Sequence, residues 1–365
     1  MVNRLVVNLA WESGRDSLRW GLLVSTLFGL TDRIGAQSGA DRQAVSSRIS
    51  VEVIWRVDFV ETVGHHAEAA AAWNDGTIWV STNNGQAIWE LDADGESIQL
   101  VREDIEIAHE VAGSPALAML PGHGMLLLAR FGVIRFRTAA DPGSIVDRIT
   151  RATVRGFGGF PNGDYVVAYG PWRDDPHKEY AVHRYDMEGR HLASWHPAFS
   201  YPEWGDQEWR AVLRMSGGPV AITGKGDLLV SDLVPFRVTR YTGGLGDRGT
   251  VVVESENVLS RVEIRRALPR PGTYTFDWSR AVFVDEMSHR GILNVLLISE
   301  RSMFRNVRYP RWVVVTPDGE VVADERMDYF LIGTIGKGTD TYLATTAGGD
   351  LVKVAVSVEE AFPQP

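Results

Sequence analysis

One unit recurs along this chain: an apolar strand, a glycine turn, a second strand, a short loop and two further strands. The first copy reads EAAAAWND, GTIWVST, QAIWELD and ESIQLVRE, within residues 68–103. Further copies begin near residues 114, 155, 217 and 280, and Val, Ile, Leu and Trp dominate their strands. The glycines that mark the first turn of each copy are Gly76, Gly124, Gly163, Gly226, Gly291 and Gly338. This repetition predicts a series of similar antiparallel sheets.

The two ends of the repeat complement each other. A sixth copy begins at residue 329 with YFLIGTIG, DTYLATTA and DLVKVAVSV, but it lacks a fourth strand. A spare strand, ISVEVIWRVDFV at residues 49–60, precedes the first copy. An open sheet edge invites aggregation, and pairing the spare strand with the last copy near Val356 removes that edge. We therefore predict an all-β fold: a six-bladed β-propeller of four-stranded antiparallel blades, closed by the N-terminal strand pairing with the last blade. A pair of β-sandwiches is the competing architecture, but it does not explain the matched missing and spare strands.

Segments such as GDLLVSDL and WVVVTPDGEVV resemble the six-bladed NHL-like or TolB-like propellers of exported bacterial proteins. The resemblance covers residues 49–359, with a short tail at 360–365. NHL repeats end their second strand with Asp; Asp232 keeps that residue, whereas Thr82, Arg130, Tyr169 and Glu300 stand at comparable places. The chain thus resembles a divergent member, and the resemblance implies a fold that serves both enzymes and binding proteins.

The N-terminal region suggests export. Residues 20–30, WGLLVSTLFGL, carry no charge, follow Arg15 and Arg19, and precede the small residues of IGAQSGA. Eleven residues are too few for a transmembrane helix, which needs about 20, but they fit the apolar part of a secretory signal. We expect residues 1–36 to be a signal segment, residues 37–48 a linker, and the protein periplasmic or secreted from a bacterium. The alternative is an amphipathic helix that caps the folded domain.

Composition excludes some functions. The chain has no cysteine, so disulfides, thiolate metal ligands and cysteine nucleophiles are absent. Its net charge of −10 argues against nucleic acid as a partner. We expect a monomer without a transmembrane span.

All the long insertions fall on one face of the expected propeller, at residues 170–178, 198–216, 257–279 and 301–308. Residues 257–279 hold four Arg against two acids, and residues 301–308 hold three Arg and no acid. Aromatic residues lie among these arginines, a combination that suits an anionic ligand or a protein partner. The expected ligand-binding residues are Arg155, Trp209, Arg214, Arg265, Arg266, Trp278, Arg280 and Arg305. The alternative is that these loops pack on each other, with each Arg paired to a local carboxylate.

Evidence for catalysis is weaker. Lactonase-like six-bladed propellers hold a divalent cation in the central channel; the flanking motifs of that family are absent here, and His65, Glu68 and Asp232 are the candidate ligands. A metal-dependent hydrolase or lyase is thus one alternative function, and a non-catalytic scaffold of an envelope complex is another; no cofactor is expected for the binding module. Asp285 and Glu286 are adjacent in one strand, so they face apart and cannot act as a glycosidase pair by themselves. The glycines of RGFGGFPNG, residues 155–163, predict close packing near the axis rather than a nucleotide site, because no helix follows them.

Overall fold

We analysed a computed structural model of the chain. It describes residues 47–82, 86–103, 116–120, 122–129, 132–138, 140, 143–147, 154–169, 177, 179–198, 217–232, 237–242, 248–254, 263–266, 274–277, 279–289, 293–302, 310–316, 321–335 and 339–360. In this part of the chain the strands form six four-stranded sheets, here called blades 1 to 6, and one two-stranded sheet.

The blades follow the order of the sequence. Blade 1 contains β2 (Ala69–Ala72), β3 (Ile78–Thr82), β4 (Ala87–Leu91) and β5 (Ile98–Arg102). Blade 2 contains β6 (Ala116–Leu120), β7 (Gly124–Ala129), β8 (Gly132–Phe136) and β9 (Ser144–Asp147). Blade 3 contains β10 (Val154–Gly159), β11 (Tyr165–Tyr169), β12 (Tyr180–Tyr185) and β13 (His191–Pro197). Blade 4 contains β14 (Val220–Ile222), β15 (Leu228–Asp232), β16 (Arg237–Tyr241) and β17 (Thr250–Glu254).

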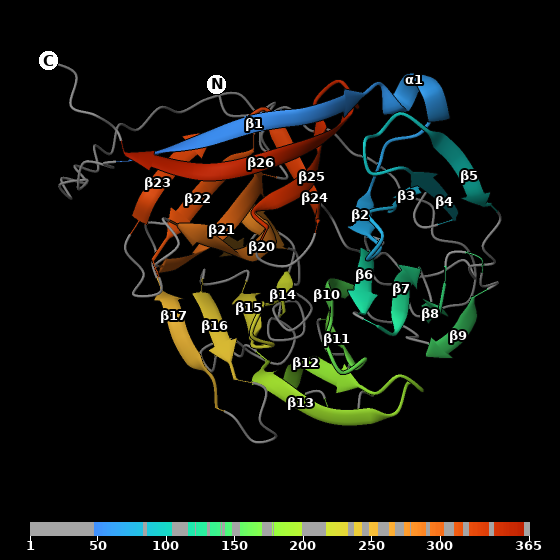
Figure 1. Ribbon diagram of the computed structural model, residues 1–365. Coiled ribbons are helices and arrows are strands. Elements are labelled where there is room, and N and C mark those ends of the chain that lie inside the picture. Colours follow the sequence, from blue (N-terminus) through green and yellow to red (C-terminus); the bar gives the residue numbers. More distant parts are fainter. Residues whose placement is uncertain are drawn as a thin grey trace, which may run out of the picture.

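The second half completes the ring. A two-stranded sheet of β18 (Glu263–Arg266) and β19 (Tyr274–Asp277) separates blade 4 from blade 5 in the sequence. Blade 5 contains β20 (Ser279–His289), β21 (Leu293–Ser302), β22 (Arg311–Val315) and β23 (Val321–Arg326). Blade 6 contains β24 (Tyr329–Thr334), β25 (Thr341–Thr346), β26 (Leu351–Glu360) and β1 (Ser47–Val57). The first strands of the blades contact one another in the cyclic order β24, β2, β6, β10, β14, β20 and back to β24, so they surround a common axis (Figure 1).

The N-terminal strand closes the ring as predicted. β1 pairs antiparallel with β26 from Ser47 opposite Glu360 to Val57 opposite Leu351, and the two strands run side by side in Figure 1. The Ile49 N–H also donates to Glu325 of blade 5, over 3.1 Å. The predicted strand 49–60 is wrong at its end.

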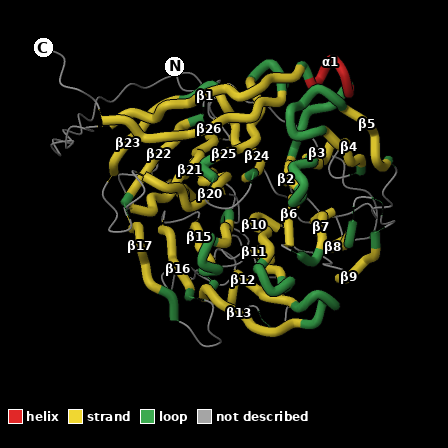
Figure 2. The backbone as a smooth tube through the Cα atoms, viewed as in Figure 1, coloured by secondary structure: helices red, strands yellow, loops and turns green. Residues whose placement is uncertain are grey.

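A short helix replaces the last residues of that expected strand. Helix α1 (Phe59–Val63) begins after Asp58, whose side chain accepts a hydrogen bond from the Glu61 N–H, and it ends at Gly64 in the left-handed conformation. It is the one helix in the described part of the chain (Figure 2). Phe59 is fully buried against residues of blades 1 and 6, so the helix turns the chain from the outermost strand of one blade to the innermost strand of the next.

Apolar layers lie between neighbouring blades. One layer, for example, joins Met287 and Trp312 of blade 5 to Leu331 and Tyr342 of blade 6, and Ile49 of β1 extends it to the closing strand. Another layer joins Phe160 and Val166 to Leu228 and Val230, between blades 3 and 4. Because each blade packs on both neighbours, the core is a ring of such layers rather than one central cluster.

Small residues allow the inner strands to approach closely. A Cβ added to Gly156 would lie 2.4 Å from the Gly218 carbonyl oxygen of blade 4, and one added to Gly333 would lie 2.0 Å from the Ala70 carbonyl oxygen of blade 1. Both distances are far below a van der Waals contact. The glycines of RGFGG are therefore explained by close packing of β10 near the axis, as the sequence predicted.

Candidate functional site

The antiparallel order of strands defines two faces of the propeller. In each blade, the first and third strands begin on one face, and the second and fourth strands end there. We call it the long-loop face, because the connections after the second and fourth strands leave the sheet from it. The opposite face, here the short-turn face, carries tight turns such as those at Gly76, Gly163 and Gly226, whose φ angles are 91°, 91° and 86°. These positive φ angles explain the glycines predicted there; Gly291 and Gly338 lie outside the described residues.

Blade 5 places an arginine on the long-loop face from every strand. Arg280 is the second residue of β20, Arg301 the second-last residue of β21, Arg311 the first residue of β22 and Arg326 the last residue of β23. The sheet register sets Arg280 directly opposite Arg301, and Arg311 directly opposite Arg326. The same register sets Glu300 opposite Arg311, so basic and acidic residues share this end of blade 5.

One of these arginines shows how a carboxylate is held. Asp324 accepts hydrogen bonds from Arg311 Nε over 2.7 Å and from Arg311 Nη2 over 2.6 Å, which is the forked geometry that guanidinium groups offer to carboxylates. Both side chains are about one quarter exposed, at 27% and 28%. Arg326, at the edge of the blade, is exposed.

Only some of the expected ligand-binding residues can be placed. Arg155 is the second residue of β10 and is half-buried. Arg265 and Arg266 lie in β18, where they stand opposite Thr275 and Tyr274 of β19. Arg280 lies in the innermost strand of blade 5. The other four, Trp209, Arg214, Trp278 and Arg305, lie outside the described residues. The residues predicted from the sequence did not include Arg301, Arg311 and Arg326, although each stands at the end of a recognisable strand.

Asp232 belongs to a buried polar network rather than to the channel. It is the last residue of β15 and only 4% exposed. Its Oδ2 accepts a hydrogen bond from Arg237 Nε over 2.8 Å, and its Oδ1 is bonded to Nε2 of His196 at the end of β13. The Nδ1 atom of His196 lies 2.9 Å from the Tyr241 hydroxyl. These contacts join the outer strand of blade 3 to blade 4.

The candidate metal ligands are not brought together. His65 and His66 are exposed in the turn between α1 and β2, and the Glu68 N–H bonds to the Ser81 carbonyl oxygen of blade 1. Asp232 lies in blade 4, and the inner strands of blades 2 and 3 separate blade 1 from blade 4 in the ring. Within the described ranges, no group of three His, Cys, Asp or Glu side chains is arranged to hold a metal ion.

Asp285 and Glu286 face opposite neighbours, as expected for adjacent residues in a strand. Asp285 accepts a hydrogen bond from Thr334 of blade 6 over 2.9 Å, whereas Glu286 lies 3.5 Å from Nη2 of Arg240 in blade 4. The Asp285 and Glu286 carboxylates thus lie in the seams between blades.

Burial raises the pKa of the Tyr342 hydroxyl well above its usual value, and the negative charges of Asp285 and Asp340 raise this pKa further.

Comparisons with known proteins support the fold and go no further. No family model matches the sequence, and no curated protein matches it. A PQQ-bound aldose sugar dehydrogenase from Streptomyces coelicolor has a TM-score of 0.52 and 12% identity, over 85% of this chain and 98% of that chain. A streptogramin B lyase has a TM-score of 0.44 and 11% identity, over 88% of this chain and 90% of that chain. A catalytically inactive virginiamycin B lyase from Staphylococcus aureus, with quinupristin, has a TM-score of 0.47 and 10% identity, over 84% of this chain and 99% of that chain.

No helix in the described part of the chain is long and apolar enough to cross a bilayer. Together, the sheet order, the closing strand and the likeness to the sugar dehydrogenase establish that this chain is a β-propeller.

Proposed function

We propose that this propeller is a binding module whose long-loop face holds an anionic ligand at blade 5. The observation that carries the proposal is the register of β20 and β21, which sets Arg280 opposite Arg301 beside the axis. Two guanidinium groups at opposite positions of a sheet can both offer charge-assisted hydrogen bonds to one anion. β18, which carries Arg265 and Arg266, lies in the connection that leads into β20, and Arg155 is the second residue of the inner strand of blade 3.

We also propose a location for the protein and a distant family relationship. Residues 1–46 lie outside the described part of the chain, but the short apolar run at residues 20–30 supports export to the periplasm or beyond. Mass spectrometry of protein exported by a bacterial host should then find an N-terminus near Gln37. The Asp232 that ends β15 supports a distant relationship to NHL-like propellers. An acidic protein partner in the envelope is the alternative ligand, and it would use the same arginines.

Calorimetric titration with inorganic phosphate, pyrophosphate, succinate and citrate tests the binding proposal. At least one of these anions should bind, and more weakly as salt rises, because exposed charges are screened beyond about 8 Å at physiological ionic strength. Arg280→Gln and Arg301→Gln should each weaken binding by about 1.5–3 kcal/mol, or roughly 10- to 150-fold. The unfolding midpoint should barely move.

Lys225→Gln is the matched control, because Lys225 is exposed in a turn of the opposite face. It should bind like the wild type. If neither a small anion nor an acidic protein binds, or if the two arginine variants bind as well as the Lys225 variant, blade 5 is not the site. Binding of an acidic protein but of no small anion would favour the alternative ligand.

A further inference from the structure

A second group of polar side chains lies on the outer part of blade 3, away from the axis. Ser194 is in β13, the outermost strand of that blade, and stands opposite His183 of β12. Its hydroxyl oxygen lies 2.8 Å from His191 Nε2 and 3.0 Å from His183 Nδ1. One serine hydroxyl therefore contacts two imidazole rings. A serine bonded to an imidazole is the pairing that activates a hydroxyl as a nucleophile.

The two imidazoles have different access to water. His183 is fully buried and stacks on Tyr169, with ring centroids 4.4 Å apart. His191 is exposed, and Ser194 is partly exposed. A hydroxyl has one proton, so it can donate to only one of the two rings. The exposed ring is the one able to exchange protons with solvent and substrate. We assign His191 as the acceptor of the Ser194 proton, and His183 Nδ1–H as the donor that orients the hydroxyl oxygen.

Neighbouring rings fix the His191 imidazole. The His177 ring stacks on it at 3.9 Å with an interplanar angle of 14°, and the Tyr185 ring meets it edge-on at 5.6 Å and 77°. A base must be held within hydrogen-bond reach of the proton that it removes. The ring contacts hold the His191 imidazole, and its Nε2 lies 2.8 Å from the Ser194 hydroxyl oxygen, within hydrogen-bond reach.

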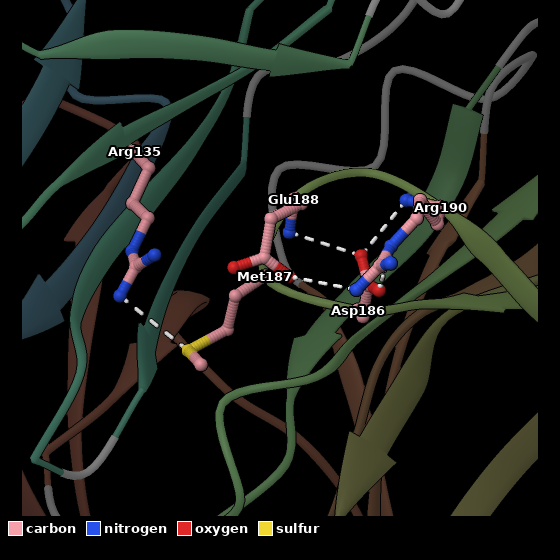
Figure 3. A network of polar contacts seen from close by, with 5 residues as sticks. All are labelled: Arg135, Asp186, Met187, Glu188 and Arg190. Atoms are coloured by element: carbon pink, nitrogen blue, oxygen red, sulfur yellow. Dashed lines mark hydrogen bonds and ion pairs between the residues drawn. The ribbon is translucent and has the colours of Figure 1, made fainter.

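The turn just before His191 is held by several hydrogen bonds. Asp186 accepts hydrogen bonds from the backbone N–H groups of Glu188 and Arg190, and Arg190 Nε donates to its other oxygen over 2.7 Å (Figure 3). Burial disfavours the charged form of Asp186, but the bonds from the Arg190 backbone and side chain and from Glu188 outweigh it and lower its pKa. Arg135 of blade 2 reaches Met187 Sδ in the same turn, over 3.4 Å (Figure 3). The start of β13 is thus fixed where His191 stands.

We propose that Ser194 and His191 form a second, reactive site on the outer part of blade 3, which accepts acyl groups from esters. The Ser194 oxygen attacks the ester carbonyl carbon, its proton passes to His191 Nε2, and the bond to the leaving alkoxide breaks as that proton is delivered to it. Water then attacks the acyl-serine, gives a proton to His191, and releases the acid as the proton returns to Ser194. Among the described strands β13 pairs only with β12, so no described strand covers its other edge.

The test is covalent labelling of the folded, full-length chain with a fluorophosphonate, which releases fluoride as the serine oxygen bonds to phosphorus. Peptide mass spectrometry of the wild type should locate one adduct, on Ser194. His191→Gln should slow labelling by about 100-fold, within the usual range for removing a general base. Ser194→Ala should abolish the adduct. Hydrolysis of p-nitrophenyl acetate, followed in parallel, should fall in the same order.

His66→Gln is the matched control, since His66 is exposed and lies between α1 and β2. It should label at the wild-type rate. An adduct confined to other residues in the folded wild type would overturn the proposal whatever the variants do. So would equal labelling of the wild type and His191→Gln, because Ser194 would then react without its base.

Discussion

His196 Nε2 and Asp232 Oδ1 are hydrogen-bonded across the seam between blades 3 and 4, and His196 is held there with a φ of 60°. Both residues are nearly inaccessible, at 2% and 4%. A left-handed conformation is unfavourable for a residue other than glycine and persists when surrounding contacts enforce it. The hydrogen bonds of His196 to Asp232 and Tyr241 are those contacts. The seam is therefore stabilised by polar contacts as well as by its apolar layer.

The left-handed conformation of His196 predicts that glycine destabilises the protein less than alanine at this position, the reverse of the usual order. His196→Ala should lower the free energy of unfolding by about 2–4 kcal/mol, because it leaves buried polar partners unsatisfied and keeps the strain. His196→Gly should be less destabilising by about 1 kcal/mol, because glycine adopts positive φ without strain. Urea unfolding measures both values.

An ordinary strand position supplies the control. At the exposed Ser357 in β26, alanine should be more stable than glycine by about 0.5–1 kcal/mol. If alanine exceeded glycine at position 196 as well, the conformation of His196 would not be strained.

Ring closure predicts that one side of β1 contributes far more to stability than the other. Ile49 is 6% exposed and belongs to the apolar layer between blades 5 and 6, so Ile49→Ala should cost about 2–5 kcal/mol. Val53 is 41% exposed, and Val53→Ala should change stability by less than about 0.5 kcal/mol. Thermal and urea unfolding of the two variants would separate these values. Equal, small effects would mean that β1 contributes little to ring closure.

The contact between β24 and β2 predicts a severe effect of a single methyl group. Gly333→Ala places a Cβ 2.0 Å from the Ala70 carbonyl oxygen, so the inner strands of blades 6 and 1 must separate. Overpacking of this kind costs about 1–3 kcal/mol or more. Gly348→Ala is the control, since its Cβ would meet nothing closer than 3.6 Å. The control should be neutral or slightly stabilising, and a neutral Gly333→Ala would show that the inner strands can yield at no cost.

The fold could be predicted because its signals are local and repeated. The alternation of apolar residues and the turn glycines mark each blade, and the count of strands at the two ends requires β1 to pair with β26. The helix at Phe59 was missed because the apolar pattern of Val57 and Phe59 also fits a strand, and the Asp58 cap that ends the strand is a subtle signal.

The proposed site could be predicted only as a face. Long insertions identify the long-loop face, but the register decides which arginines meet there. A register shift lies between Ala281 and Phe283, close to the pair formed by Arg280 and Arg301, and such shifts are not visible in the sequence. The same holds for Ser194 and His183, which lie 11 residues apart and meet through the pairing of β12 with β13. Side-chain chemistry can be seen in the sequence, but cross-strand proximity depends on the sheet.

The buried Tyr342 hydroxyl should make the stability of the protein sensitive to alkali. Its pKa in the folded state is raised by burial and by the charges of Asp285 and Asp340, whereas in the unfolded chain it is near the ordinary value of about 10. Below that value the hydroxyl is neutral in both states, so its contribution to stability is complete. Above it, the unfolded chain ionises first and is stabilised, so the free energy of unfolding falls as pH rises beyond about 10.

Tyr342→Phe tests this dependence, because phenylalanine keeps the ring in the layer between blades 5 and 6 and removes the ionisable group. Urea unfolding between pH 9 and pH 11.5 should show a shallower loss of stability for the variant than for the wild type. Tyr180→Phe is the control, since Tyr180 is 38% exposed on β12, and it should keep the wild-type slope. Identical slopes for all three proteins would mean that the buried hydroxyl near Asp285 is not what makes the fold sensitive to alkali.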